Sequence, residues 1–325
     1  MKAYQLFILF LVLCLCGCSF GEALPKETDP ITTSTATTTI QTEPPTTSGT
    51  TAQPDVPTTE AGVPTTETTA PPQVIVQPEP IDEDFVKVIA YIPDLFVDLR
   101  YSTENNFTNQ KIYGFTDVWL RYGTVKKLML VQEELKQSNL YLKIWDGFRP
   151  PSAQFKLWNV CPDPTYVSNP NNGFSSHSRG NTIDITLVHK DGTELVMPTG
   201  FDDFSKLADR DYSDCSKEAA DNALFLEELM KKYGFKPYFG EWWHFSDTQS
   251  YPVDESFEPV AAAMYYANCN EYISLRVAPS ASSDLITKIL VGEQFQVVAQ
   301  HNDFALVEYK GLRGYVLRKY ILPVK

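Results

Sequence analysis

Hydrophobic and polar residues are distributed differently before and after about residue 85. The stretch from Thr28 to Pro72 holds 18 Thr among 45 residues, interleaved with Pro, Ser and Glu, and residues 22–84 contain no Phe, Trp or Tyr. Such a stretch cannot bury enough apolar area to offset the entropy that ordering would cost. The pattern therefore predicts a disordered Thr/Pro-rich linker over residues 19–84, ahead of a globular part.

From residue 85 onward, apolar positions recur with the periods of strands and helices. Helical spacing predicts amphipathic helices over 124–140 and 219–233. Alternation and aromatic content predict strands over 86–91, 96–101, 142–146, 181–188 and 238–245. In 181–188 the Ile and Leu residues take one face, and Asp184 lies on the opposite, polar face, away from the core. This order predicts an α+β domain, an antiparallel sheet with helices, over residues 85–252.

The pattern changes after an apparent inter-domain linker at Pro252–Pro259. Short β runs separated by turn residues follow, over 273–277, 285–290, 294–300, 305–309 and 314–317. Five short strands in about 60 residues predict a small all-β barrel over residues 260–325.

The first 18 residues have the pattern of a secretory signal peptide, with Lys2, an apolar run over 6–15 and then Gly17-Cys18. Residues 15–18 resemble the lipobox of bacterial lipoproteins, whose cysteine is acylated when the signal is removed. The resemblance implies lipidation at Cys18. It also implies an exported lipoprotein anchored on the outer side of a bacterial cytoplasmic membrane. The alternative is a signal peptide cut at another small residue.

Charge excludes one class of partner. The net charge is −14, and residues 22–84, with eleven acidic residues against Lys26 alone, account for most of it. Binding to phosphate backbones requires clusters of Lys and Arg, and the sequence has none. We therefore expect no nucleic-acid partner.

Two histidine segments carry the candidate chemistry. His177 precedes Asp184 by seven residues, and Glu241 precedes His244 by three on an aromatic strand. A carboxylate buried beside two Trp is costly unless it has a charged partner or a shifted pKa. Two imidazoles and one carboxylate on zinc leave a tetrahedral position open for water, and Glu241 could take the proton of that water. Unrelated histidines with a chance Glu are the alternative.

The spacing Ser175-x-His177-x6-Asp184 with Glu241-x-x-His244 resembles the zinc peptidases of the D-Ala-D-Ala carboxypeptidase and dipeptidase group (family M15), which share an α+β fold. Three further segments resemble the VanX-type D-alanyl-D-alanine dipeptidase branch: Asp98–Phe107, Asp146-Gly147-Phe148-Arg149-Pro150 and Glu241-Trp242-Trp243-His244. The similarity extends through nearly all of residues 85–250. It therefore implies that fold and that zinc chemistry.

The resemblance also implies roles for single residues. The positions that match the ligands of one Zn²⁺ per chain are His177, Asp184 and His244. Glu241 matches the catalytic base, and Arg149 matches the arginine that stabilises the oxyanion of the tetrahedral intermediate. The positions where that branch holds the termini of the dipeptide are Tyr101, Ser175 and one Asp of the Asp202-Asp203 pair, of which Asp202 is preferred.

The predicted barrel resembles bacterial SH3 domains, through its Gly292-Glu293 turn and its segment 311–321. In exported bacterial proteins such modules often contact cell-wall peptide, so the resemblance implies the cell wall as a partner. A free dipeptide is too small to need a second module, and the barrel is therefore expected to be dispensable for its cleavage.

Three functions follow from these patterns. The first is zinc-dependent hydrolysis of D-alanyl-D-alanine or similar small dipeptides. The second is a D,D-carboxypeptidase or endopeptidase that acts on peptidoglycan stem peptides. The third is a non-catalytic wall-binding lipoprotein, against which the presence of both Glu241 and Arg149 argues.

The remaining Cys and His residues carry no assigned chemistry. The sequence allows two arrangements of Cys161, Cys215 and Cys269. Either Cys161 and Cys215 form a disulfide, or all three are free thiols. His189 and His301 are interpreted as turn residues, because each lies beside hydrophilic turn sequence.

Overall fold

The computed structural model describes residues 76–325. The predicted signal peptide, the predicted lipidation site Cys18 and the predicted linker up to residue 75 lie outside these residues. Within the described part, none of the helices has the length and hydrophobicity needed to cross a membrane.

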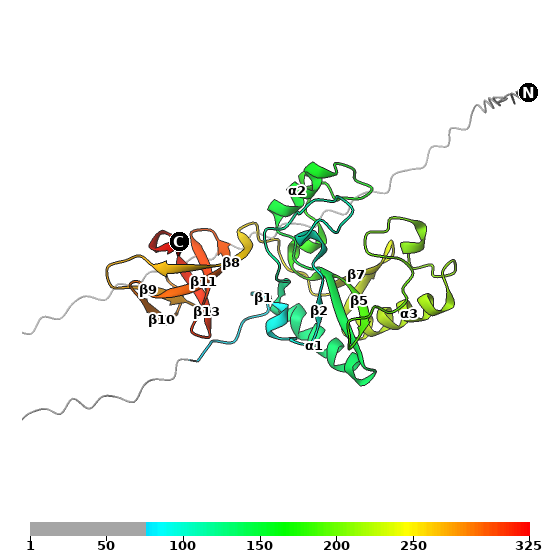
Figure 1. Ribbon diagram of the computed structural model, residues 1–325, viewed down its shortest axis with the longest axis horizontal. Coiled ribbons are helices and arrows are strands. Elements are labelled where there is room, and N and C mark those ends of the chain that lie inside the picture. Colours follow the sequence, from blue (N-terminus) through cyan, green and yellow to red (C-terminus); the bar gives the residue numbers. More distant parts are fainter. Residues whose placement is uncertain (1–75) are drawn as a thin grey trace, which may run out of the picture. The chain divides into compact units, whose positions relative to one another are not determined.

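The α+β domain comprises the elements from β1 to β7, and a five-stranded sheet forms its centre (Figure 1). The order is β2-β4-β5-β7-β6, with bounds Phe96–Val97, Leu140–Asp146, Thr182–His189, Glu241–Asp247 and Phe235–Tyr238. Neighbours pair antiparallel except β2, which runs parallel to β4. The sheet is therefore antiparallel apart from one edge pair, and the predicted α+β fold of an antiparallel sheet with helices is confirmed.

The first two predicted strands are shorter than the sequence indicated. β1 (Phe85–Lys87) pairs with β3 (Trp119–Arg121) outside the central sheet and passes into a 3-10 helix, Val88–Ala90. The chain turns here because the N–H groups of both Tyr91 and Ile92 donate back to the carbonyl of Val88. β2 leads in the same way toward a 3-10 helix, Arg100–Ser102, which contains the candidate site residue Tyr101.

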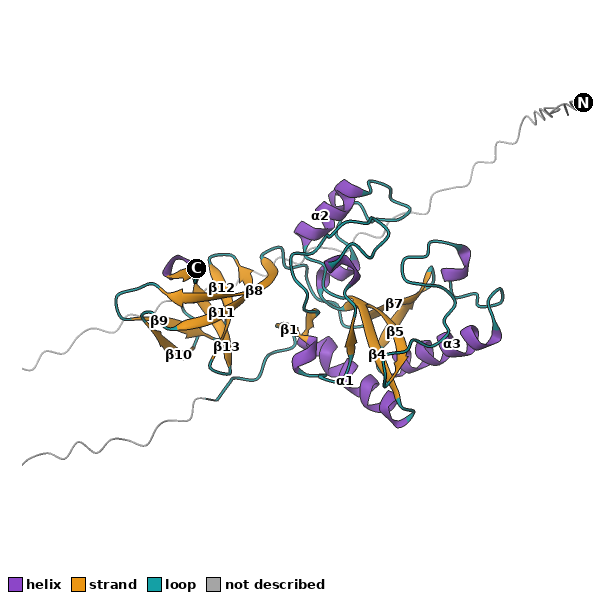
Figure 2. Cartoon of the chain, in the orientation of Figure 1, coloured by secondary structure: helices purple, strands orange, loops and turns teal. Residues whose placement is uncertain are grey.

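Three α-helices accompany the sheet (Figure 2). They are α1 (Tyr122–Gln137), α2 (Pro151–Val160) and α3 (Lys217–Lys232). α1 packs against β4 and α3 packs against β6, as the helical spacing of their apolar residues predicts. α2 was not predicted. It begins at a Pro in its first turn, directly after the segment that resembles the dipeptidase motif.

Both faces of β5 are buried. Ile183 and Ile185 are fully covered, and so are Thr182 and Thr186 on the other face, where Asp184 is only 4% exposed. The prediction that Asp184 lies away from the core is therefore wrong in its burial, because the side chains of His177 and His244 lie against its carboxylate. A buried ionised residue in this position needs partners.

The barrel contains seven strands in the order β10-β9-β13-β12-β11-β8-β14 (Figure 1). In chain order from β8, they are Phe257–Ala267, Tyr272–Arg276, Leu285–Leu290, Gln294–His301, Phe304–Tyr309, Leu312–Leu317 and Ile321–Pro323. Five of them correspond to the predicted strands. β8 and β14 were not predicted, and β8 begins inside the stretch that was interpreted as a linker.

The core of the α+β domain extends into the barrel. Four barrel residues belong to the same buried cluster as the α+β domain: Phe257, Val298, Ala299 and Leu306. Eleven further buried barrel residues form a separate cluster that includes Leu275 and Val316. His301 also belongs to this junction, since its side chain is only 18% exposed and its Nε2 lies 3.1 Å from Asp254 Oδ2. The interpretation of His301 as a mere turn residue is thus incomplete.

Candidate active site

The register of the sheet brings two candidate ligands together. Asp184 on β5 and His244 on β7 are direct cross-strand partners, and Asp146 at the end of β4 is the partner of Asp184 on the other side. Directly opposed residues of an antiparallel pair have neighbouring side chains. Accordingly, His244 Nδ1 lies 3.0 Å from Asp184 Oδ1.

The third candidate ligand comes from a tight turn before β5. His177 lies in a 3-10 helix, Ser176–Arg179, that Ser175 caps: the Ser175 Oγ accepts from the His177 N–H at 3.3 Å. Gly180 ends the turn with φ +76°, a conformation that favours glycine. His177 Nδ1 donates to the Gly147 carbonyl at 2.8 Å. This bond leaves the lone pair of Nε2 free, and Nε2 lies 3.4 Å from Asp184 Oδ2.

These three side chains fit a bound metal ion. One ligand atom from each of His177, Asp184 and His244 lies within 4.8 Å of the others. Asp184 Oδ1 is buried and accepts no hydrogen bond from the described residues, although His244 is near. Burial by itself raises the pKa of Asp184, but the two histidines lower it below its ordinary value. An ionised carboxylate between two imidazoles is a donor set typical of zinc.

Glu241 lines the same cleft from the first position of β7. Its Oε2 lies 3.4 Å from His244 Nδ1, and its side chain is 30% exposed. Burial raises the pKa of Glu241, and the charge of Asp184 raises it further. A carboxyl group whose pKa is shifted toward neutrality is suited to accept and return a proton.

Arg149 is held in a fixed orientation by groups that sequence reasoning did not identify. Its Nη2 donates to Asp146 Oδ2 at 2.6 Å, its Nη1 to Gln154 Oε1 at 3.1 Å and its Nε to the Tyr113 hydroxyl at 3.3 Å. Tyr113 in turn donates to Asp146 Oδ1 at 2.6 Å. Burial opposes the charge, but Asp146 outweighs it and raises the pKa of Arg149 above its ordinary value. The guanidinium therefore stays charged.

Tyr101 and Asp202 form a second polar pair in the cleft. The Tyr101 hydroxyl donates to Asp202 Oδ2 at 2.9 Å, and the Arg149 guanidinium lies 5.1 Å from the centre of the Tyr101 ring. Asp202 has φ +57°, which is unusual for a residue other than glycine. Burial first, and then the charge of Asp184, raise the pKa of Asp202 to about 8. Asp203, the less favoured residue of the pair, does not line the cleft.

All of the predicted site residues of the α+β domain meet in one cleft of about 320 Å³. They are Tyr101, Arg149, Ser175, His177, Asp184, Asp202, Glu241 and His244. Sequence reasoning missed the aromatic residues of its lining: Tyr166, Phe204 and Tyr238. It also missed Asp146, for which a signal existed, since Asp146 stands three residues before Arg149 in the same motif.

The α+β domain and the start of the barrel, residues 82–263, match the family model described as D-ala-D-ala dipeptidase. The matched part is more than half of the chain. The chain belongs to the D-ala-D-ala dipeptidase family. It is therefore a zinc metallopeptidase of that family, and the resemblance inferred from its motifs is confirmed.

Curated relatives agree with the family model. A D-alanyl-D-alanine dipeptidase of Escherichia coli is 36% identical over 172 residues, which cover 52% of this chain and 89% of that protein. One of Enterococcus faecalis is 33% identical over 46% of this chain and 83% of its own length. A solved vancomycin-resistance D,D-pentapeptidase VanY with Zn(II) aligns at 14% identity and TM-score 0.28, over 41% of this chain and 74% of that one, a likeness too low to support an argument.

A second family model matches the barrel. Residues 271–321 match the bacterial SH3 domain, which confirms the predicted resemblance and fold of this part. The cysteines of the described residues, Cys161, Cys215 and Cys269, are half-buried and unbridged. The structure thus favours three free thiols over the alternative of a bridge.

Proposed function

We propose that the protein hydrolyses D-alanyl-D-alanine, or similar small dipeptides, with one zinc ion held by His177, Asp184 and His244. The observation that carries this proposal is the convergence of a His-Asp-His group, Glu241 and Arg149 on one cleft. When bound, zinc supplies a Lewis acid and lowers the pKa of a water molecule. The side chains of the chain supply the remaining steps.

Glu241 moves the proton, because it lies beside His244 and its pKa is raised toward neutrality. It accepts a proton from the attacking water and passes it to the leaving amine. Arg149 donates hydrogen bonds to the oxygen on which negative charge develops. Its contacts with Asp146 and Gln154 fix the guanidinium before the substrate binds, which is the condition for strong stabilisation of a transition state.

The lining of the cleft supplies groups for both substrate termini. Asp202, held by Tyr101, offers a carboxyl group to a free ammonium group, and the positive charge of that ammonium favours the ionised form of this acid, whose pKa burial raises to about 8. The Ser175 hydroxyl accepts from the His177 N–H and retains its own proton to donate to a carboxylate. A free dipeptide carries both termini, whereas an acylated stem peptide lacks the ammonium and would leave Asp202 with the Tyr101 hydroxyl but without a cation.

A D,D-carboxypeptidase or endopeptidase that acts on stem peptides is the second candidate. It is favoured by the exposed aromatic rim of the cleft, since Tyr166 is 46% and Tyr238 is 57% exposed. Exposed aromatic side chains beside a catalytic cleft can bind residues of a longer peptide.

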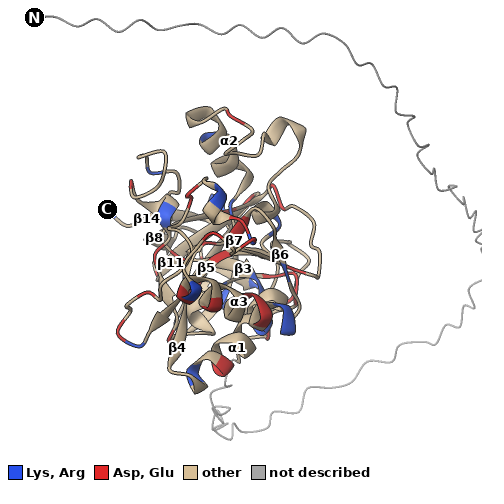
Figure 3. Cartoon of the chain, turned by 90° about the vertical axis from the view of Figure 1, so that its right-hand side faces the viewer, with Lys and Arg blue, Asp and Glu red and all other residues tan. Residues whose placement is uncertain are grey.

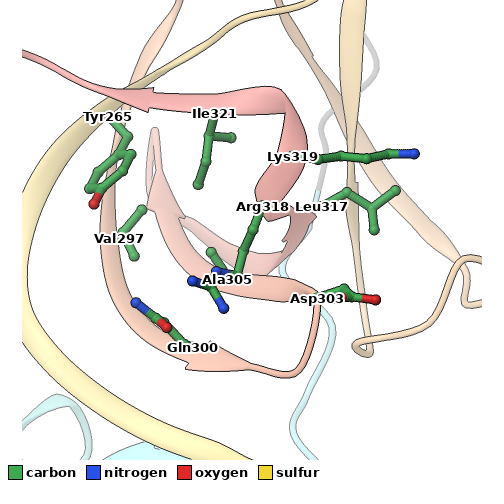
Figure 4. Close-up of a pocket in the computed structure, with 9 residues that line it drawn as sticks. All are labelled: Tyr265, Val297, Gln300, Asp303, Ala305, Leu317, Arg318, Lys319 and Ile321. Carbon is green, nitrogen blue, oxygen red and sulfur yellow. The ribbon is translucent and has the colours of Figure 1, made fainter.

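We also propose that the barrel binds cell-wall peptide in a cavity of about 580 Å³ (Figure 4). Val297, Ala305 and Ile321 give this cavity an apolar lining. Figure 4 shows Arg318 extending toward Gln300, while Lys319 points away. The Arg318 guanidinium suits a peptide that carries carboxylates, and Asp303 adds one negative charge to the same lining.

The cellular location of the protein is also part of the proposal. We propose that it is exported and anchored by lipid on Cys18, which would place the cleft on the wall side of the membrane. The mass of the mature N-terminal peptide, measured from bacteria that express the full chain, tests this. An unlipidated N-terminus at another residue would contradict it.

The catalytic proposal is tested by incubating the zinc-loaded full chain with D-alanyl-D-alanine and, separately, with a pentapeptide stem that ends in D-alanyl-D-alanine. We expect kcat/KM to be larger for the dipeptide, on the order of 10²-fold or more, because the stem brings no ammonium group to Asp202. Glu241→Gln is the control for contaminating peptidases. Faster release of D-alanine from the stem would support the second candidate, and no cleavage of either would support a non-catalytic binding protein.

A further inference from the structure

Phe257, the first residue of the barrel, packs against aromatic side chains of the α+β domain, one of which is Phe148, the residue before Arg149. Phe257, at the start of β8, is 1% exposed. Its ring stacks on Phe85, with centroids 4.3 Å apart and planes at 9°. Phe85 lies 4.3 Å from Phe148, and Phe257 lies 5.8 Å from Phe148 and 5.4 Å from Trp119. The barrel thus closes an aromatic cluster that belongs to the other domain.

Phe148 connects this cluster to the candidate active site. It stands between Gly147, whose carbonyl accepts the hydrogen bond of His177 Nδ1, and Arg149, whose N–H donates to the His177 carbonyl at 3.3 Å. Its own N–H donates to the Trp119 carbonyl at 3.0 Å. A displacement of the Phe148 ring would therefore move both the acceptor that orients His177 and the backbone that carries Arg149.

A second route leads from the cluster to the same histidine. Phe85 lies so close to Gly180 that a Cβ added there would come within 2.3 Å of its ring. Gly180 ends the turn that carries His177, and the Gly180 N–H donates to the His177 carbonyl at 3.1 Å. The Phe85 ring, stacked flat on Phe257, thus limits where this turn can lie.

We propose that Phe257 is a positioning residue for the active site, and that the first strand of the barrel fixes Arg149 and His177 through Phe148 and Phe85. The effect on cleavage rests on the proposed function, whereas the effect on the metal site does not. Polar contacts hold β8 and β12 in place beside the cluster: Ser152 donates to Glu258 at 2.6 Å, and Lys87 Nζ lies 2.9 Å from Glu308.

This proposal changes the expectation that the barrel is dispensable for cleaving a free dipeptide. Truncation after residue 255 would remove Phe257 together with Val298, Ala299 and Leu306, all of which belong to the shared buried cluster. The barrel then has a task that does not depend on any wall ligand.

The test compares two leucine substitutions in the full chain. Phe257→Leu removes the stacked ring and keeps most of the apolar volume. Phe295→Leu makes the same change in the separate barrel cluster, where Phe295 is equally buried at 2% exposure. The first measurement is the rate of Zn²⁺ transfer from each loaded protein to a chelating dye. We expect Phe257→Leu to accelerate release about tenfold, the lower end of the effect of disturbing a group that hydrogen-bonds to a metal ligand, because the Gly147 carbonyl would shift with Phe148. Phe295→Leu should change it less than twofold.

The second measurement separates positioning from stability. In folded protein, Phe257→Leu should lower kcat for D-alanyl-D-alanine about tenfold and leave KM nearly unchanged, because displaced catalytic groups act on the transition state. Phe148→Leu should also accelerate zinc release. In the double variant Phe148→Leu/Phe257→Leu, the acceleration should be much smaller than the product of the two single effects, since the two rings act through one contact.

Unchanged zinc release and kcat in folded Phe257→Leu would overturn the proposal, and so would equal effects of Phe257→Leu and Phe295→Leu. If the unmodified protein does not cleave D-alanyl-D-alanine, the proposed function fails. The comparison of zinc release still decides whether Phe257 positions the site.

Discussion

The two buried clusters of the protein are built from different side chains. In the described residues, every buried polar or charged side chain precedes β8, and those of the site include Asp146, Arg149, His177 and Asp184. The separate barrel cluster consists of apolar residues such as Leu275, Ile289 and Val307. On the surface of the α+β domain, α1 and α3 carry residues of both charges (Figure 3).

The difference shows where free energy is used for function and where it is used for stability. Burying an ion costs several kcal/mol unless partners compensate it. The α+β domain bears this cost at its cleft, where Arg149 and Asp146 pair and Asp184 lies between histidines. The separate barrel cluster is apolar and bears no such cost.

The largest expected effect comes from removing one ligand. His177→Ala should abolish zinc binding and, with it, hydrolysis, because the remaining Asp184 and His244 form an incomplete donor set. Metal analysis of the purified variant gives the result directly. His189→Ala changes an exposed histidine outside the cleft and serves as the control. Undiminished zinc in His177→Ala would show that the metal is bound elsewhere.

Glu241→Gln should keep zinc and lower kcat about 10²–10⁴-fold, because the amide retains the shape but cannot accept a proton. Zinc content and turnover of D-alanyl-D-alanine are measured on the same preparation. Glu228→Gln, on the exposed side of α3, provides the matched control, since its side chain is 70% exposed. Turnover within a few-fold of the unmodified protein would assign the proton transfer to another group.

Arg149→Lys should lower kcat by about 10²–10³-fold, which is typical for the loss of one preorganised oxyanion donor. Lysine keeps the charge but cannot reproduce the planar fork that contacts both Asp146 and Gln154. Steady-state kinetics separate the two parameters. A change confined to KM would instead identify Arg149 as a binding group for the substrate carboxylate.

Ile289→Val in the barrel should lower the free energy of unfolding by about 1 kcal/mol and leave kcat unchanged, because it removes one methylene from a fully apolar cluster. Ile185→Val, adjacent to Asp184 on β5, is the matched variant in the other cluster, and both residues are fully buried. We expect a similar loss of stability there, together with reduced activity. Equal kinetic effects of the two variants would remove the distinction between the clusters.

The smallest effect concerns the junction. Burial raises the pKa of Asp254, but its hydrogen bonds with His301 and with the Ser256 N–H lower it below its ordinary value overall. The stabilisation is therefore present above the ordinary pKa of an aspartate and is lost as the pH falls through the lowered one. Asp254→Asn should destabilise the protein by less than about 1 kcal/mol at pH 6, with the difference shrinking near pH 3. Urea unfolding at both pH values measures it, and a pH-independent difference would contradict this account.

Much of the catalytic cleft was predictable, because metal and acid–base chemistry require particular residue types at fixed spacing. His177, Asp184, Glu241 and His244 carry that signal in the sequence itself. The network that orients Arg149 was not predictable in the same way, since Tyr113 reaches Asp146 from 33 residues away and its ring has no pattern of its own.

In the fold, too, some elements were predictable from local sequence and others were not. β4 and β5 follow from local alternation, whereas the aromatic run over 238–245 hides a turn between β6 and β7 that only Gly240 signals. β8 was missed because Phe257 is buried by Phe85 and Phe148, which lie far away in the sequence. A contact between residues so far apart produces no alternating or helical pattern of apolar residues in the sequence around either of them.

Asp184 and His244 oppose each other directly across β5 and β7, and with the proposed ligand set this pairing couples metal affinity to strand alignment. A slip of one residue between these strands would turn His244 to the opposite face of the sheet and leave Asp184 with one imidazole. An ion that needs both ligands binds only the aligned state, so zinc stabilises that alignment by mass action. Chelation should therefore increase hydrogen exchange at the amides that join β5 to β7 before it affects β4. The bound metal would then also stabilise the pairing of β5 with β7 in the central sheet.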